Sequence, residues 1–117
     1  MSKKTETKEA PKTRTFEITV KGMTYYVTIS TMRNMAKKCP MHVIFEREPN
    51  NRYDPNAIKV ILDAEPWRGF HIGHVARQTA VVLAPQMDAG EFHPEETWLM
   101  WVNPDKSEGG VLVKVKR

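Results

Sequence analysis

The sequence predicts a mainly β protein, a small antiparallel barrel of about six short strands with one or two short helices. Two observations lead to this fold class. Several short segments alternate apolar and polar residues with the period of two that marks a strand with one buried face. Turn-forming residues separate these segments, without the regular strand–helix alternation of a parallel sheet. The 117 residues suffice for one domain, and we expect a helix to cover one opening of the barrel.

The first strand is expected to begin near Thr15. Phe16, Ile18 and Val20 alternate with polar residues, so one face of this segment is apolar. Residues 1–14 show no such period and carry five basic against two acidic residues. This composition predicts a disordered basic tail. Residues 15–117 then form the single folded domain.

The segment after Gly22 is rich in aromatic and β-branched residues. Residues 25–29 (YYVTI) therefore predict a strand, or a bulged continuation of the first strand. Ser30 is a suitable N-cap for a short helix over residues 31–38, which Pro40 is expected to end.

The other strands follow from further alternating or β-branched segments, with a long polar turn at residues 48–56. They are predicted at residues 43–46, 57–62, 70–75, 98–102 and 111–115. Between the last two we expect a loop over residues 103–110.

One longer helix is predicted at residues 76–87, where apolar residues recur with helical spacing. Pro85 is expected to kink or split it, because proline lacks the amide hydrogen of a helix interior. Gly90 is a suitable stop after its end.

The charge of the chain is unevenly distributed. The formal net charge is +4, and residues 1–14 account for most of it, which leaves the remainder close to neutral. A broadly basic body is therefore excluded, and any nucleic-acid binding by the folded part must come from a local site. The tail is either a solvated leader or a source of weak, salt-sensitive attraction.

The cysteine and histidine pattern argues against a metal site. Cys39 is the only cysteine, so neither an intramolecular disulfide nor a cysteine-based zinc site is expected. His71 and His74 lie three residues apart in an extended segment, where their side chains should point to opposite faces. We expect no metal and no cofactor, and Cys39 is expected to be buried or incidental rather than catalytic.

The sequence lacks the motifs of common enzymes and of membrane proteins. It has no glycine-rich phosphate loop and no Gly-x-Ser-x-Gly motif. No apolar segment is long enough to span a membrane, and no secretory signal is present. We therefore expect a cytoplasmic protein that has no membrane partner and is not an enzyme.

The polar turn at residues 48–56 is a candidate binding loop. It is longer than a minimal hairpin requires, and Asn51, Tyr53 and Asp54 together offer an amide, a stacking ring and a carboxylate. A nucleotide end is recognised by such groups, because a ring stacks on a base and an acceptor binds a sugar hydroxyl. The alternative is a rigid connector in which Asn and Asp side chains bond back to the backbone.

Two further positions suggest nucleic-acid contacts. Arg77 lies at the start of the predicted helix, where amide hydrogens and a guanidinium attract phosphate; the alternative is an ordinary surface arginine. Trp98 and Trp101 lie in one apolar segment. They are expected to pack against the barrel, although one exposed indole would suit base stacking.

Four separate segments of this sequence together resemble the HIRAN domain. They are residues 20–26 (VKGMTYY), 47–60 (REPNNRYDPNAIKV), 72–75 (IGHV) and 80–85 (AVVLAP). The segments occur in the same order as in that family and span roughly residues 15–90. The resemblance implies an OB-like six-stranded barrel with short helices. It also implies recognition of single-stranded DNA at its free 3′ end, in DNA repair or replication-fork processing.

The resemblance assigns roles to particular residues. It implies that Tyr25 stacks on the terminal base and that Tyr53 does the same or forms a wall of the pocket. Asp54 would accept a hydrogen bond from the 3′-hydroxyl. Asn51 would contact the nucleotide, while the last phosphates would be held by His74 and Arg77.

This chain departs from the family pattern at two positions. Thr24 stands where the eukaryotic fork-remodelling members have an arginine, so one phosphate contact is missing. Arg52 stands where proline is common, and it either loosens the loop or supplies a replacement cation. Thr24 and Arg52 are therefore further candidates for the DNA-binding surface.

An alternative function is a protein-interaction or adaptor domain, a partner of a helicase or nuclease, that kept the barrel and lost DNA binding. The near-neutral charge outside the tail and Thr24 favour this alternative. A nuclease would need clustered carboxylates for metal ions, and Asp54 has no obvious acidic partner within its loop.

Overall fold

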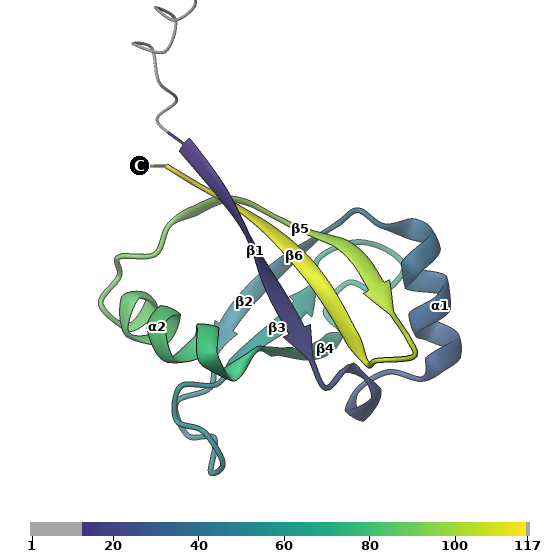
Figure 1. The fold of residues 1–117 in the computed structure, drawn as a ribbon, viewed down its shortest axis with the longest axis horizontal. Coiled ribbons are helices and arrows are strands. Elements are labelled where there is room, and N and C mark those ends of the chain that lie inside the picture. Colours follow the sequence, from purple (N-terminus) through teal and green to yellow (C-terminus); the bar gives the residue numbers. More distant parts are fainter. Residues whose placement is uncertain (1–12, 117) are drawn as a thin grey trace, which may run out of the picture.

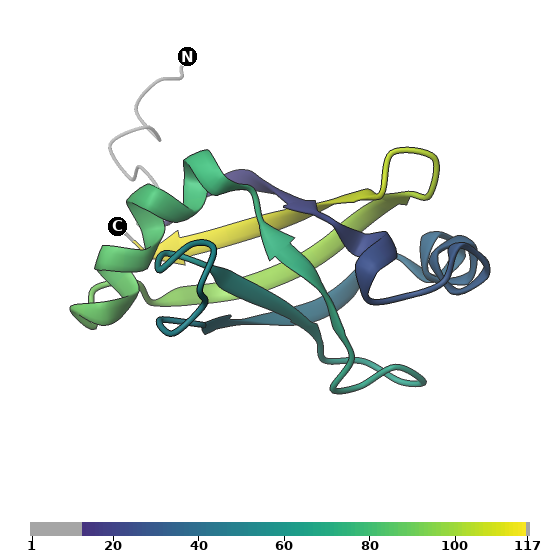
Figure 2. The ribbon, with the colours of Figure 1, turned by 90° about the horizontal axis from the view of Figure 1, so that it is seen from below.

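The computed structural model describes residues 13–116, which form a closed antiparallel barrel of six strands with two α-helices outside it (Figure 1, Figure 2). The predicted fold class is confirmed. The strands are β1 (Thr13–Lys21), β2 (Met41–Arg47), β3 (Ile58–Leu62), β4 (His71–Val75), β5 (Pro94–Asn103) and β6 (Glu108–Lys116). The helices are the 3-10 helix η2 (Met23–Tyr25), α1 (Ile29–Lys38) and α2 (Arg77–Asp88).

The strand order around the barrel is β1-β4-β3-β2-β5-β6, and all neighbours are antiparallel. β1 already begins at Thr13, so the first strand includes two residues that the sequence assigned to the tail. The rest of the predicted tail, residues 1–12, lies outside the described residues.

The inward faces of the strands and one face of each α-helix form the core. The alternation that predicted the strands matches their burial, since Ile58, Val60 and Leu62 of β3 are fully buried and the residues between them are not. Met32 and Met35 of α1 and Leu83 of α2 are also buried. At roughly 25 cal/mol per Å² of apolar surface, burial of such side chains is the main stabilising term of the fold.

The prediction of a strand at residues 25–29 is wrong. Gly22 has a φ of 72°, which turns the chain out of β1 and into η2. Thr28 rather than Ser30 caps α1, since its hydroxyl oxygen accepts the backbone N–H of Thr31 at 3.1 Å. The helix therefore begins at Ile29 and, as predicted, ends before Pro40.

α2 runs without a break from Arg77 to Asp88, so Pro85 does not split it. A proline in the last turn removes one intrahelical donor. The end of the helix is closed in spite of this, because the backbone N–H of Ala89 donates to the Pro85 carbonyl at 3.0 Å. Gly90 follows with a φ of 72°, as expected for a C-terminal stop.

β4 contains an irregularity that changes which face its residues occupy. The register with β3 pairs Val60 with Gly73 but Ile61 with His71, so Ile72 is an extra residue in β4. Ile72 and Gly73 are both buried. This bulge shifts by one residue the alternation of inward-facing and outward-facing positions along β4.

The last two strands are longer than predicted, and only a turn at residues 104–107 separates them. Gly109 and Gly110 were expected in a loop but lie in β6. A Cβ on Gly110 would lie 2.2 Å from Nε1 of Trp101. Glycine is required here because the indole covers the strand, and not because the chain turns.

Candidate functional site

A cavity of about 330 Å³ opens where the end of β1, η2, the β4–α2 junction and the loop at residues 48–57 meet. All six residues that the family resemblance assigned to DNA binding line it. Its lining residues are Lys21, Gly22, Tyr25, Tyr26, Asn51, Tyr53, Asp54, Ala57, His74, Val75 and Arg77. These residues come from three separate stretches of chain, residues 21–26, 51–57 and 74–77, and the barrel brings them together.

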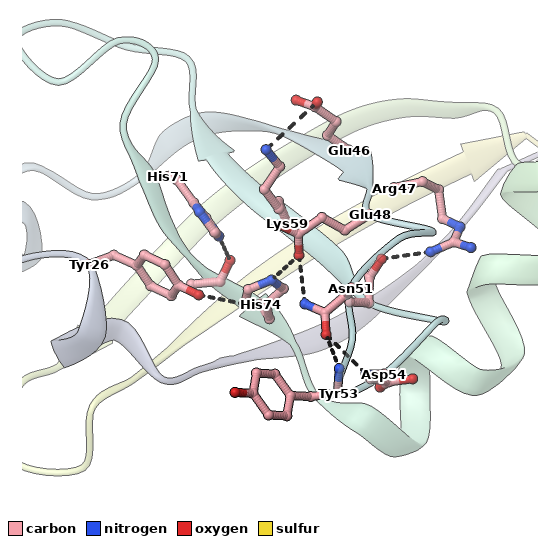
Figure 3. A network of polar contacts seen from close by, with 12 residues as sticks. Tyr26, Glu46, Arg47, Glu48, Asn51, Tyr53, Asp54, Lys59, His71 and His74 are labelled. Carbon is pink, nitrogen blue, oxygen red and sulfur yellow. Dashed lines mark hydrogen bonds and ion pairs between the residues drawn. The ribbon is translucent and has the colours of Figure 1, made fainter.

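Two tyrosine rings stand exposed at this cavity. Tyr25 of η2 is 87% exposed and Tyr53 of the loop is 82% exposed. In Figure 3 the ring of Tyr53 projects away from the loop that carries it. An aromatic ring left in water is a large apolar surface available to a ligand, and a nucleobase is a suitable partner for its face.

The loop at residues 48–57 is held by its own side chains. Asn51 Oδ1 accepts the backbone N–H groups of Tyr53 (2.8 Å) and Asp54 (2.9 Å). Asp54 Oδ1 accepts the N–H of Asn56 at 2.9 Å. The expectation that Asn and Asp side chains of this loop bond back to its backbone and make it rigid is therefore correct.

Arg47, at the end of β2, anchors the far side of the same loop. Its guanidinium donates to the carbonyl oxygens of Ala57 (2.7 Å) and Pro55 (2.9 Å). The same group pairs with Asp88 of α2 at 2.9 Å and holds the pKa of that carboxyl below its usual value. One half-buried cation thus ties the loop to β2 and to α2.

Glu48 is the centre of a polar network that joins the loop to β4 (Figure 3). Its Oε1 accepts hydrogen bonds from Asn51 Nδ2 at 3.1 Å and from His74 Nε2 at 2.7 Å. Burial alone would raise the pKa of Glu48, but the hydrogen bonds from His74 and Asn51 outweigh it and lower the pKa. Glu48 therefore stays ionised at neutral pH.

The other nitrogen of His74 faces Tyr26. The Tyr26 hydroxyl lies 3.3 Å from Nδ1, which accepts its proton when Nε2 carries the ring hydrogen. Burial, with a smaller contribution from the Glu48 charge, raises the pKa of Tyr26, so this hydroxyl remains a donor. The network fixes the ring of His74 from both sides.

The prediction that His71 and His74 point to opposite faces is wrong. Their rings lie 4.8 Å apart between centroids, and the ring of Tyr26 lies 3.9 Å from that of His71. The cause is the extra residue Ile72, which resets the alternation of β4. Burial, then the nearby charge of His74, lowers the pKa of His71.

Asp54 and Arg77 are paired with each other. Arg77 Nε lies 3.4 Å from Asp54 Oδ2, and another guanidinium nitrogen, Nη2, donates to the Tyr53 carbonyl at 3.2 Å. The Arg77 side chain is nevertheless 73% exposed. It has room to meet a phosphate, while the Asp54 carboxylate keeps acceptor capacity beyond the two partners it already has.

The two further candidates lie outside the lining of the cavity. Thr24 turns toward the β5–β6 turn, where its backbone N–H donates to the Ser107 hydroxyl at 2.8 Å. Arg52 is exposed, and within the described part of the chain it makes no hydrogen bond or ion pair. Arg52 is free to reach a ligand at the loop, whereas Thr24 is committed to a structural contact.

Sequence reasoning missed Glu48, Tyr26 and Arg47 as parts of the site. Glu48 and His74 are 26 residues apart, and no local pattern links them. Tyr26 lies in the segment 20–26, to which the resemblance assigned a binding role only at Tyr25 and Thr24. The one available signal was that all three residues occur inside the family segments at 20–26 and 47–60.

Other candidate groups have structural explanations. Trp98 stacks on His42 with ring centroids 3.6 Å apart, and Trp101 Nε1 donates to Glu17 at 2.9 Å. Half-buried Cys39 donates to the Met35 carbonyl at 3.3 Å, and burial raises its pKa to about 11. Such a thiol is protonated at neutral pH and unreactive.

Within residues 13–116, no three histidine, cysteine, aspartate or glutamate side chains gather closely enough to bind a metal ion. In the same range, no helix has the length and apolar character needed to cross a membrane.

The arrangement of rings, acceptors and a guanidinium at the cavity suits binding of a polar, aromatic ligand.

Comparison with known proteins agrees with the resemblance noted from the sequence. The model of the HIRAN domain family matches residues 13–108. The chain is 38% identical over 69 residues to the helicase-like transcription factor of Mus musculus, a match that covers 59% of this chain and 6% of that protein. The chain thus corresponds to a small part of the length of this relative.

Two solved structures share the fold. The crystal structure of the HIRAN domain of human HLTF superposes with a TM-score of 0.64 and 24% identity, covering 88% of this chain and 77% of that one. A protein from Lactobacillus plantarum gives a TM-score of 0.62 and 23% identity, covering 87% and 95% of the respective chains.

Proposed function

The chain belongs to the HIRAN domain family, and from this premise we propose that it is a binding module for single-stranded DNA that recognises the free 3′-hydroxyl end. Its role is one of binding rather than catalysis, in DNA repair or replication-fork processing. The resemblance of residues 20–26 and 47–60 to the family's binding segments implies this ligand.

The observation that carries the proposal is the pair of exposed tyrosines beside a carboxylate in one cavity. Tyr25 and Tyr53 are both more than four-fifths exposed, and Asp54 lines the same cavity. Two rings suit successive bases, or a base and its sugar, with about 1–3 kcal/mol per stacked base. The near-neutral charge outside residues 1–14 fits a ligand that is held by stacking as well as by phosphate contacts.

The end itself would be recognised by Asp54. A carboxylate accepts a hydrogen bond from a 3′-hydroxyl, whereas a 3′-phosphate at the same place brings a second negative charge next to it. Two charges about 4 Å apart repel by about 1–4 kcal/mol, depending on exposure. Asp54 is held in place by Asn56 and Arg77, so it cannot easily turn away from an unfavourable ligand.

The phosphates behind the end would be bound by Arg77. Its exposed guanidinium already lies between Asp54 and the Tyr53 carbonyl, and helix α2 begins at this residue. A phosphate there would meet both the guanidinium and the amide hydrogens of the first helical turn. His74 would add a second contact, while Asn51 shapes the loop and offers its amide to the nucleotide.

A fluorescence titration tests this function. A short single strand labelled at its 5′ end is titrated with the full chain at low and at moderate salt, first with a 3′-hydroxyl and then with a 3′-phosphate. We expect saturable binding of the hydroxyl form and at least about tenfold weaker binding of the phosphate form. Equal affinity for the two ends would contradict end recognition.

The alternative function is an adaptor for a helicase or nuclease that has lost DNA binding. One observation favours it: both cations that line the cavity are already paired, Lys21 with Glu108 and Arg77 with Asp54. The same titration separates the two functions, because an adaptor binds neither form of the strand even at low salt.

A further inference from the structure

The charge of residues 18–45 differs from that of the rest of the folded chain. This stretch contains four basic residues and no acidic residue, whereas the remainder of residues 15–117 contains nine basic and twelve acidic residues. Three of the four basic residues, Arg33, Lys37 and Lys38, lie in α1. The near-neutral total of the folded part therefore includes a local excess of positive charge on one helix.

The three cations of α1 are exposed and unpaired. Met32 and Met35 turn one side of the helix to the core, and Arg33, Lys37 and Lys38 are all exposed. None of these three forms an ion pair within residues 13–116. By contrast, both cations that line the DNA-end cavity have a carboxylate partner. We call the three unpaired side chains the α1 basic face.

The spacing along α1 places two of these charges next to each other. Arg33 and Lys37 are four residues apart, so they are neighbours on the helix surface, where like charges repel. Lys37 and Lys38 lie in the last turn, where the negative end of the helix dipole favours a cation. Arg33 lies in the middle of the helix, beyond the reach of this effect. A bound anion would relieve the repulsion between Arg33 and Lys37.

Helix α1 is continuous with one side of the DNA-end cavity. In Figure 1 and Figure 2, η2 lies between the start of α2 and helix α1. Tyr25 of η2 lines the cavity, and α1 begins four residues later at Ile29. Four extended residues span at most about 14 Å, and four helical residues add about 6 Å. The Cα of Arg33 therefore lies within about 20 Å of that of Tyr25.

The opposite side of the cavity attracts a chain of phosphates less strongly. Helix α2 carries one basic and one acidic residue, Arg77 and Asp88. In the loop at residues 48–57, Arg52 is outnumbered by Glu48 and Asp54. A strand whose end lies in the cavity therefore meets several unpaired cations only in the direction of η2 and α1.

We propose that the α1 basic face binds phosphates of the same DNA strand whose 3′ end lies in the cavity, on the 5′ side of that end. This inference rests on the function proposed above. Stacked nucleotides repeat at about 3.4 Å along one strand, so a span of about 20 Å corresponds to about six nucleotides. The bound phosphates are those about four to eight nucleotides from the end, within the usual site size of an OB-like barrel. The ligand is thus a 3′ end that continues as a single-stranded segment.

Neutral linkages in the DNA test the proposal. The probes are 3′-hydroxyl strands of about twelve nucleotides, labelled at the 5′ end. One has ordinary phosphates, and the other has uncharged methylphosphonates at the linkages about four to eight nucleotides from the 3′ end. We expect the wild-type full chain to bind the neutral strand about tenfold more weakly. This comparison needs no variant, so a folding defect cannot account for its result.

A double variant assigns the loss to α1. Arg33→Gln/Lys37→Gln should bind the ordinary strand about tenfold more weakly than the wild type does. It should bind the neutral strand no more weakly than the ordinary one, because the two changes remove the same contacts. Losses that simply add would overturn the assignment.

A matched double variant separates a local contact from the overall charge. Arg14→Gln/Lys114→Gln also removes two surface cations, which lie where β1 begins and β6 ends, at the far end of β1 from η2. We expect its affinity to stay within about twofold of the wild type, because salt screens charges over such distances. A loss equal to that of Arg33→Gln/Lys37→Gln would show a general attraction and overturn the proposal.

A 3′-phosphate version of the ordinary strand separates this inference from the proposed function. The α1 basic face does not contact the end, so Arg33→Gln/Lys37→Gln should keep the wild-type preference for the 3′-hydroxyl. If the wild type shows this preference but binds the neutral and ordinary strands equally, only the α1 site is excluded. If the wild type binds none of the strands, both the function and the α1 site are excluded.

Discussion

The candidate DNA-end site contains two groups of side chains that the protein holds in very different ways. Arg47, Glu48 and Asn51 direct their polar atoms to hydrogen bonds within the protein. Tyr25 and Tyr53 line the cavity beside this loop, with more than four-fifths of their surface in water. We refer to the first three residues as the polar framework and to the two tyrosines as the exposed rings.

This difference predicts that the polar framework contributes to the stability of the fold and that the exposed rings contribute to the affinity for a ligand. The polar framework is formed before any ligand arrives, so its loss should cost folding free energy. The exposed rings pack against little of the protein, so their loss should cost binding free energy instead. The following predictions test this division, from the largest expected effect to the smallest.

Arg47→Ala should lower the free energy of unfolding by about 2–4 kcal/mol, because two loop carbonyls lose a charged donor and α2 loses its contact with the loop. Urea unfolding followed by circular dichroism measures this change. Arg52→Ala is the matched control in the same region, with an expected change within about 0.5 kcal/mol. A loss below about 1 kcal/mol for Arg47→Ala would show that the loop does not depend on this anchor.

Tyr25→Ala should weaken binding of a single strand by about 1–3 kcal/mol, or roughly 5- to 150-fold, because one base loses its stacking partner. The free energy of unfolding should change by less than about 0.5 kcal/mol, since the ring is 87% exposed. Tyr25→Phe keeps the ring and should keep the affinity. If Tyr25→Phe binds as weakly as Tyr25→Ala, the hydroxyl and not the ring is responsible.

The free energy of unfolding should fall as the pH drops below about 6.5, the ordinary pKa of histidine. Burial lowers the pKa of folded His71, so the unfolded chain takes up the proton first, and acid favours unfolding. The loss occurs between the ordinary pKa and the lower pKa of the folded state. Urea unfolding across this range measures it, and His71→Gln should flatten the profile. A variant with the wild-type profile would assign the effect to another group.

Protonation of Glu48 should lower the free energy of unfolding further in more acidic solution. Its pKa is lowered in the folded state, so its contribution is complete above the ordinary carboxyl pKa and disappears as the pH falls through the folded value. Glu48→Gln keeps a hydrogen-bond acceptor but removes the charge, and it should reduce the acid dependence below about pH 4.5.

Arg77→Ala should reduce the salt dependence of DNA binding by about one phosphate contact. The measurement is the slope of the logarithm of affinity against the logarithm of salt concentration. An unchanged slope would exclude Arg77 from phosphate binding. The guanidinium would then act only through its ion pair with Asp54.

Much of the fold could be predicted from the sequence, because local alternation and burial coincide in the strands. Ile18 and Val20 of β1 are buried as their spacing indicates. Residues 25–29 were misassigned because their aromatic and β-branched composition suits a strand. The turn at Gly22 instead directs the chain into η2, and Thr28 caps α1. The position of the Ile72 bulge depends on pairing with β3, which local composition does not encode.

Part of the candidate site could be predicted from local chemistry, which indicated Asn51, Tyr53, Asp54 and Arg77, whereas Tyr25 and His74 were indicated only by the family resemblance. Turn chemistry alone indicated that Asn51 bonds back to the backbone, as the structure has it. Neither the resemblance nor the spacing indicated that Asp54 and Arg77 are paired, or that Glu48 links Asn51 to His74. These contacts join distant stretches of chain, and only the closed barrel brings them together.

The most direct test of end recognition compares two affinity ratios. The dissociation constant for a 3′-phosphate strand is divided by that for the 3′-hydroxyl strand, in the wild type and in Asp54→Asn. The variant keeps an acceptor for the Asn56 N–H but loses the charge that repels phosphate. We predict a ratio of at least about 10 in the wild type and a ratio close to one in the variant, which should still bind the hydroxyl strand. A wild-type ratio near one, or the same high ratio in both proteins, would contradict recognition of the 3′ end by Asp54.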